Sequence, residues 1–143
     1  LECDRMADAQ GAARSVTRPP PTCLIVDDDA ISGLVATQLL SNAGCAALHI
    51  MDANSAWDHL SAQRLAFDTL LLDWELAETT GFELLKQWRS YLPKSMDIIF
   101  LSGNEVEQEK REQCENLGAR RFWTKPLTAA AVQEWLKERS TGD

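Results

Sequence analysis

The chain has 143 residues, of which 45% are hydrophobic and 25% charged, enough for one domain with a sizeable core and too few for two. Its formal net charge of −8 argues against unassisted binding to nucleic acid or to an anionic membrane, because phosphate contacts need clustered Lys and Arg. No apolar run reaches the roughly 20 residues of a membrane span, and no segment has the pattern of a signal peptide.

Residues 1–21 are predicted to be a leader or an interdomain linker. They are rich in Ala and Arg and end in three consecutive prolines at 19–21, which favour a stiff, extended stretch just before the fold. Acidic and basic residues balance within this segment, so the excess negative charge lies in the remainder of the chain.

From Thr22 onward, short apolar runs alternate with segments of helical periodicity. The expected elements, in chain order, are a strand at 23–26, a helix at 30–44, a strand at 46–51, a helix at 54–63, a strand at 69–72, a helix at 82–92, a strand at 97–101, a very polar helix at 106–117, a strand at 121–123 and a helix at 128–140. The residues that mark the first helix are Ile31, Leu34, Val35, Gln38 and Leu39.

Capping and breaking residues support these boundaries. Gly44 is a natural stop for the first helix, Asp52 or Asn54 can cap the second, and Pro93 ends the third. Five strands alternating with five helices predict an α/β fold: one doubly wound domain over 22–143, with a five-stranded parallel sheet in the order 2-1-3-4-5 and helices on both faces.

The four cysteines show no spacing typical of a zinc site or a redox motif. They are scattered along the chain, at Cys3, Cys23, Cys45 and Cys114. Free thiols of this kind fit a reducing compartment, so we expect a cytoplasmic protein.

Polar side chains follow four of the expected strands at their carboxyl ends, which in a doubly wound sheet meet at one edge. The residues are Asp27, Asp28 and Asp29 after the first strand, Asp73 after the third, Ser102 after the fourth and Lys125 after the fifth. Taken singly, each has an ordinary explanation: an Asp can cap a helix, Ser102 can serve a turn and Lys125 can be a solvated charge. Together they would place carboxylates, a hydroxyl and an ammonium, which can bind a common ligand, at one edge of the sheet.

The clustered carboxylates need a cation. Two carboxylates about 4 Å apart repel by roughly 4 kcal/mol at an effective dielectric constant near 20, and Lys125 supplies only one positive charge. Hard oxygen ligands suit Mg²⁺ best, with Mn²⁺ as a second candidate. The Ser102 hydroxyl and the Lys125 ammonium suit phosphate oxygens. Asp73 is then a candidate nucleophile that would form an aspartyl phosphate.

These residues stand in motifs that resemble a response-regulator receiver domain. The motifs are VDDD at 26–29, LLLDW at 70–74, Gly81, LSG at 101–103 and FWTKP at 122–126, and the resemblance runs from Thr22 to about Ser140. It implies a two-component phosphorelay, in which Asp73 takes a phosphoryl group from a histidine kinase or a histidine phosphotransfer domain. Such a receiver catalyses its own phosphorylation and dephosphorylation, and we do not expect a turnover enzyme.

The resemblance also implies how the metal and the phosphate are held. Asp28 would ligate Mg²⁺ directly and Asp27 largely through water, beside Asp73 itself and the backbone carbonyl of Glu75. Ser102 and Lys125 would each bond a phosphate oxygen, and the Lys125–Pro126 peptide bond would be cis.

The same resemblance implies a switch. Ser102 would move toward the phosphate, and Phe122 would enter the space that it leaves. The surface made by 106–117, 121–123 and 128–140 would then shift and bind a downstream protein target.

Two residues are expected to set the lifetime of the phosphorylated state. Glu75 is bulkier and more acidic than the Asn, Gln or Met that is frequent at its position, and Asn104 stands two residues after Ser102. Ala77 replaces a usual Pro and Thr80 a frequent Asp, so the loop after the third strand can be looser.

Three other functions compete with this interpretation. The first is a receiver-fold docking module that acts without phosphorylation. The second is a metal-dependent phosphohydrolase, because Asp27 and Asp29 form a DxD motif, although such enzymes need a longer chain. An FMN-binding protein is a weaker alternative, since three acids follow the first strand where a phosphate-binding loop would be needed.

Overall fold

The computed structural model describes residues 19–62 and 66–141. The expected leader or linker at 1–21 lies outside these residues, apart from its three prolines. Within the described part of the chain, no helix is both long enough and apolar enough to cross a membrane.

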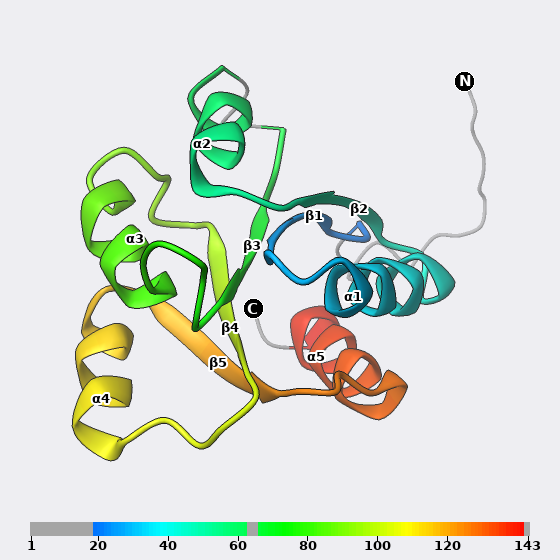
Figure 1. The fold of residues 1–143 in the computed structure, drawn as a ribbon. Coiled ribbons are helices and arrows are strands. Elements are labelled where there is room, and N and C mark those ends of the chain that lie inside the picture. The colour runs from blue at the N-terminus through cyan, green and yellow to red at the C-terminus, as the bar shows by residue number, and fades with distance from the viewer. Residues whose placement is uncertain (1–18, 63–65, 142–143) are drawn as a thin grey trace.

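Five strands and five helices alternate strictly along the described part of the chain, as predicted (Figure 1). In order they are β1 (Thr22–Val26), α1 (Ala30–Asn42), β2 (Ala46–Ile50), α2 (Ala53–Ala62), β3 (Thr69–Asp73), α3 (Gly81–Trp88), β4 (Asp97–Ser102), α4 (Gln108–Asn116), β5 (Ala119–Thr124) and α5 (Ala129–Thr141).

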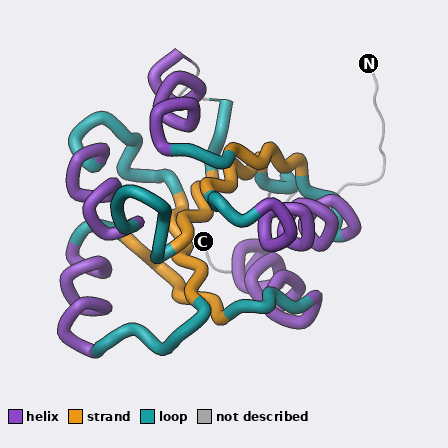
Figure 2. The backbone as a smooth tube through the Cα atoms, in the orientation of Figure 1, coloured by secondary structure: helices purple, strands orange, loops and turns teal. Residues whose placement is uncertain are grey.

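The strands, drawn in orange in Figure 2, form one parallel sheet. Their order is β2-β1-β3-β4-β5, which confirms the predicted topology. β3 is central, and all five of its residues are buried. Its Leu71 pairs with Ile25 of β1 and with Ile99 of β4. Uninterrupted apolar runs such as 70–72 are what a strand needs when helices cover both faces of the sheet.

Each face of the sheet has its own core. On one face α1 and α5 pack against β-strand residues such as Ile25 and Leu71, with Trp135 of α5 almost fully buried. On the other face α2, α3 and α4 cover residues such as Leu70 and Leu72 (Figure 1). The strands therefore hold the polar residues at their carboxyl ends on a rigid, doubly covered support.

The helix α1 forms where the apolar spacing predicts it, but the marked residues are not its buried face. Ile31 is 72% exposed and Leu34 is 64% exposed. The residues of α1 that are buried are Gly33, Ala36 and Leu40. Small residues let this helix lie close to the sheet, and an apolar surface is left facing outward.

The start of α3 explains the glycine of the sequence motif. The Thr80 hydroxyl accepts a hydrogen bond from the Glu83 N–H at 3.1 Å and caps the helix. A Cβ on Gly81 would lie 2.5 Å from the carbonyl oxygen of Asp73, so only glycine lets α3 begin this close to the end of β3. α3 ends at Trp88, four residues before the predicted boundary at 92.

Candidate functional site

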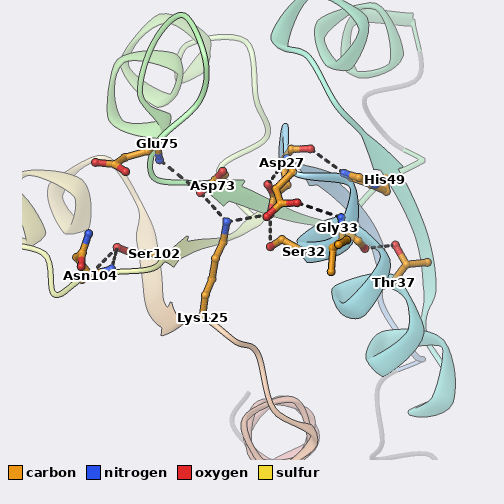
Figure 3. A network of polar contacts seen from close by, with 12 residues as sticks. Asp27, Ser32, Gly33, Thr37, His49, Asp73, Glu75, Ser102, Asn104 and Lys125 are labelled. Carbon is orange, nitrogen blue, oxygen red and sulfur yellow. Dashed lines mark hydrogen bonds and ion pairs between the residues drawn. The ribbon is translucent and has the colours of Figure 1, made fainter.

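Four strand ends bring the predicted site residues to one edge of the sheet (Figure 3). Asp73 and Ser102 are the last residues of β3 and β4. Asp27 and Asp28 directly follow β1, and Lys125 directly follows β5. The parallel register sets them side by side, because Asp73 pairs with Leu101 and Ser102 pairs with Thr124.

Three carboxylates form what we call the acidic cluster: Asp27, Asp28 and Asp73. One ligand oxygen from each lies within 4.8 Å of those of the other two. Asp27 is fully buried and Asp73 is 4% exposed. Buried like charges at this separation are unfavourable unless a cation compensates them.

Lys125 supplies one compensating charge. Its Nζ lies 3.1 Å from Oδ2 of Asp27 and 3.1 Å from Oδ1 of Asp73, so one ammonium bridges two members of the acidic cluster (Figure 3). Burial would lower the pKa of Lys125, but the Asp73 and Asp27 carboxylates outweigh burial and hold this pKa above its ordinary value. The Lys125–Pro126 bond is cis, as the resemblance implies.

The Asp27 carboxylate is held by further donors that sequence reasoning missed. The Ser32 hydroxyl donates to Oδ2 at 2.6 Å, and the Asp29 N–H donates to Oδ1 at 2.9 Å. Burial alone would raise the pKa of Asp27, but the bonds from Ser32, Asp29 and Lys125 keep it below its ordinary value. The sequence feature that could have indicated this role of Ser32 is its hydroxyl in the first turn of the helix that follows the three aspartates.

Asp29 does what a single aspartate after a strand commonly does. Its side chain accepts a hydrogen bond from the Ile31 N–H at 3.1 Å and caps α1. The structure therefore separates the three consecutive acids: Asp29 is a helix cap, while Asp27 and Asp28 belong to the acidic cluster. Asp52 likewise caps α2, since its Oδ1 accepts from the Ser55 N–H at 2.8 Å.

Asp73 is the group with the most perturbed acidity in the cluster. Burial, opposed by Lys125 and reinforced by the nearby Asp27 charge, raises the pKa of Asp73 from 3.8 to about 6. The Glu75 N–H lies 3.4 Å from its Oδ1. The Glu75 side chain is exposed, and Figure 3 shows it directed away from Asp73.

This raised pKa predicts how the stability of the metal-free protein depends on pH. A folded state that holds the Asp73 proton more tightly than the unfolded state loses stability as the pH rises from about 4 to about 6. Asp73→Asn cannot ionise, so its free energy of unfolding should match wild type near pH 3.5. At pH 7.5 it should be about 2 to 3 kcal/mol higher, at about 1.4 kcal/mol per pKa unit. Urea unfolding in EDTA measures this gap, and a gap that does not change with pH contradicts the prediction.

Ser102 and Asn104 form a local turn. The Ser102 hydroxyl donates to the Asn104 carbonyl and accepts from the Asn104 N–H at 3.1 Å. Its one hydroxyl hydrogen is therefore used within its own loop, and Figure 3 shows the pair apart from Lys125. A phosphate-bonding role requires this hydroxyl to turn.

The expected switch residue Phe122 is partly buried and packs between β4 and α4. Its ring stacks on Phe100 at 5.4 Å between centroids, and the Arg111 guanidinium lies 4.4 Å from its centroid. Trp74, next to Asp73, lies 5.2 Å from Phe100 and 6.4 Å from Phe122. Aromatic contacts thus run from the end of β3 to α4.

The donor set of the acidic cluster fits a hard divalent cation. It offers only carboxylate oxygens, and one ammonium does not neutralise three carboxylates. Asp27 already accepts three hydrogen bonds, whereas no side-chain hydrogen bond or ion pair of Asp28 is found among residues 19–62 and 66–141. Asp28 is therefore better placed to coordinate an ion directly, whereas Asp27 is better placed to contact it through a bound water.

A family model described as the response regulator receiver domain matches residues 23–137. Among curated proteins, the two-component response regulator ORR1 of Oryza sativa subsp. indica is 32% identical over 132 residues, which are 87% of this chain and 55% of that protein. The sensory/regulatory protein RpfC of Xanthomonas campestris pv. campestris is 29% identical over 118 residues, 80% of this chain and 16% of RpfC. The chain thus spans about half the length of the rice relative and less of RpfC.

Solved structures with the same fold include two of similar size. A CheY-like response regulator receiver domain protein from Methanospirillum hungatei JF-1 has 25% identity and a TM-score of 0.72, covering 85% of this chain and 94% of its own. The chemotaxis response regulator CheY4 of Vibrio cholerae has 26% identity and a TM-score of 0.70, covering 84% of this chain and 98% of its own.

Proposed function

Because this chain belongs to the response regulator receiver domain family of two-component signalling, we propose that Asp73 accepts a phosphoryl group from a phosphohistidine. The donor would be a histidine kinase or a histidine phosphotransfer domain. The observation that carries the proposal is the placement of Asp73, at the end of the central strand, inside the acidic cluster and 3.1 Å from Lys125. A carboxylate in such surroundings is suited to nucleophilic attack on phosphorus.

Asp73 and Lys125 would take the main parts in the phosphoryl transfer. An oxygen of the Asp73 carboxylate attacks the phosphorus and forms a P–O bond, while the P–N bond breaks and its electron pair stays with the leaving imidazole. Lys125 contacts both Asp27 and Asp73, so its ammonium can keep its bond to Asp27 and turn from Asp73 to a phosphate oxygen.

The acidic cluster would hold Mg²⁺, with Mn²⁺ as an alternative. Asp28, Asp73 and the Glu75 carbonyl would be direct ligands, and Asp27 would act through water. When bound, the ion supplies positive charge beside the phosphate oxygens. The Glu75 N–H donates to the Asp73 carboxylate, and Asn104 is hydrogen-bonded to Ser102 after the neighbouring strand β4. We propose that these two residues set how fast water reaches the aspartyl phosphate.

Phosphorylation of Asp73 would change the conformation of a partner-binding surface through Ser102 and Phe122. A phosphoryl group adds about −1.5 to −2 charge and three strong acceptors, which can draw the Ser102 hydroxyl away from its turn with Asn104. Phe122, which contacts Arg111 of α4, would follow and shift the α4-β5-α5 surface toward a downstream protein target. We further propose that 22–143 act as the receiver unit, that 1–21 are its leader or linker, and that it works in the cytoplasm without contacting nucleic acid.

The direct test is incubation with acetyl phosphate and Mg²⁺ followed by intact-mass measurement. One added phosphoryl group that depends on Mg²⁺ and on Asp73 supports the proposed function. Mg²⁺ binding with no phosphate incorporated from acetyl phosphate or from a phosphohistidine donor contradicts it and favours a docking module that works without phosphorylation.

The outward apolar face of α1 lies beside a groove that reaches Lys125. Ile31, Leu34 and Val35 are 72%, 64% and 37% exposed. A groove of about 290 Å³ lies next to them, and its lining includes Lys125 and Leu127. We propose that a helix of the histidine-bearing partner packs here, because this apolar surface is continuous with the lysine of the acceptor site.

Leu34→Glu should separate the two kinds of donor. We expect about tenfold slower transfer from whichever histidine kinase or phosphotransfer domain labels wild type, because a charge is buried at the contact, and an unchanged rate with acetyl phosphate. The matched control is Leu48→Glu, at a leucine on β2 that is 38% exposed. Equal slowing with both donors would place Leu34 in the chemistry and contradict a docking role.

A further inference from the structure

The backbone of Asp27 is tied to β2 on both sides. Its N–H donates to the Ile50 carbonyl at 3.1 Å, and its carbonyl lies 2.7 Å from Nε2 of His49. If β2 continued, the N–H of Asp52 would be the next donor to the Asp27 carbonyl. However, β2 ends at Ile50, and Asp52 caps α2 instead. A side chain therefore supplies the donor that the sheet would otherwise provide. Since a carbonyl oxygen only accepts, Nε2 of His49 carries the hydrogen.

This bond acts on two acidic residues at once. The carbonyl of Asp27 belongs to the planar peptide group that joins Asp27 to Asp28. Holding its oxygen fixes the orientation of that plane, and with it the direction in which the Asp28 side chain leaves the backbone. The Asp27 carboxylate is held separately, by Ser32, Asp29 and Lys125.

The His49 ring lies directly against Gly33 of α1; both residues are labelled in Figure 3. A Cβ on Gly33 would lie 2.0, 2.1 and 2.3 Å from three atoms of this imidazole, so the ring occupies the space that a side chain at 33 would need. Glycine is unfavourable inside a helix, and Gly33 stands at the fourth position of α1. The Thr37 hydroxyl also donates to the Gly33 carbonyl at 2.8 Å. The pair of Gly33 and His49 thus brings an imidazole against the Asp27 backbone.

We propose that His49 is a positioning residue for the metal site: seated on Gly33, it holds the Asp27–Asp28 peptide so that both carboxylates converge with Asp73. The inference rests on the proposed function, because it concerns the ion that assists transfer to Asp73. His49 itself touches neither the ion nor the phosphate. Residues that orient metal ligands in this way commonly change metal affinity by about 10- to 100-fold when they are replaced.

The chain contains a matched control. His59 on α2 also donates to a backbone carbonyl, from Nδ1 to that of Ser55 at 2.9 Å. His59→Phe removes the same kind of bond from a helix, away from the acidic cluster. A general loss of stability would affect both histidine variants, whereas a positioning role is specific to His49.

The experiment compares four variants: His49→Phe, His49→Gln, Gly33→Ala and His59→Phe. Tryptophan fluorescence, with Trp74 beside the site, gives the Mg²⁺ Kd, and thermal unfolding in EDTA gives the stability without metal. We expect His49→Phe to weaken Mg²⁺ binding about tenfold, and Gly33→Ala to do the same by displacing the ring. His49→Gln keeps an N–H donor and should recover most of the affinity, and His59→Phe should bind as wild type.

An unchanged Mg²⁺ Kd in His49→Phe, with or without lower stability, overturns the positioning role. Should that variant not fold, Gly33→Ala keeps the imidazole and makes the same comparison. Failure of the proposed function has a different signature: wild type binds Mg²⁺, yet neither acetyl phosphate nor a phosphohistidine donor labels Asp73. In that case the variant affinities still decide whether His49 orients the metal ligands.

Discussion

Asp73→Asn is expected to abolish phosphate incorporation completely, the largest single effect that the site predicts. The amide is not nucleophilic, and no other member of the acidic cluster occupies the end of the central strand. Intact-mass measurement after incubation with acetyl phosphate and Mg²⁺ should show one added phosphoryl group on wild type and none on the variant.

Asp29→Asn is the control for this experiment. It makes the same chemical change in the loop that follows β1, at an exposed residue whose capping role an asparagine can keep. We expect normal labelling of this variant. Phosphate retained by Asp73→Asn would contradict the assignment of the acceptor, and peptide mapping would then identify the residue that carries it.

Lys125→Ala should impair both stability and chemistry. Removing the ammonium leaves the carboxylates of Asp27 and Asp73 buried without their shared cation. Breaking a buried ion pair in this way costs about 3 kcal/mol or more of unfolding free energy, so urea unfolding in EDTA should show a loss of this size. Mg²⁺ should restore part of it and should bind more tightly than to wild type, because the ion no longer competes with the ammonium.

The same substitution removes the cation that would contact a phosphate oxygen during transfer. Loss of one such group commonly slows a reaction about 100-fold or more, and we expect a decrease of this order in the labelling rate at saturating Mg²⁺. Lys86→Ala is the control, since the exposed pair of Lys86 with Glu83 contributes less than about 1 kcal/mol. Full stability of Lys125→Ala in EDTA would show that the bridge does not hold the acidic cluster together.

The order of elements and the sheet topology could be predicted because periodicity and strand–helix alternation are local properties. Boundaries were less accurate. β5 begins at Ala119, two residues before the predicted strand, because its pairing with β4 continues past an irregularity between Ile98 and Ile99. Backbone pairing decides where that strand begins, and the polar Arg120, which stands between Ala119 and the predicted strand, gives no apolar signal for it.

The apolar pattern also did not predict which face of α1 packs on the sheet. Apolar residues at helical spacing predict a helix, but the face that packs on the sheet is the one with Gly33 and Ala36. How close a helix approaches the sheet depends on what the strands present beneath it, here the His49 ring. That information comes from a segment some fifteen residues away along the chain.

The sequence by itself determined the fold class, and it brought Asp27, Asp28, Asp73, Ser102 and Lys125 to one edge, because parallel strands end together. Only the tertiary structure decided how these groups are connected. It placed the Lys125 ammonium between two carboxylates, turned the Ser102 hydroxyl to Asn104, and added Ser32 and His49 around Asp27. Hydrogen bonds and ion pairs form only when donor and acceptor lie about 3 Å apart, to within a few tenths of an ångström, and the packing of separate elements sets those distances.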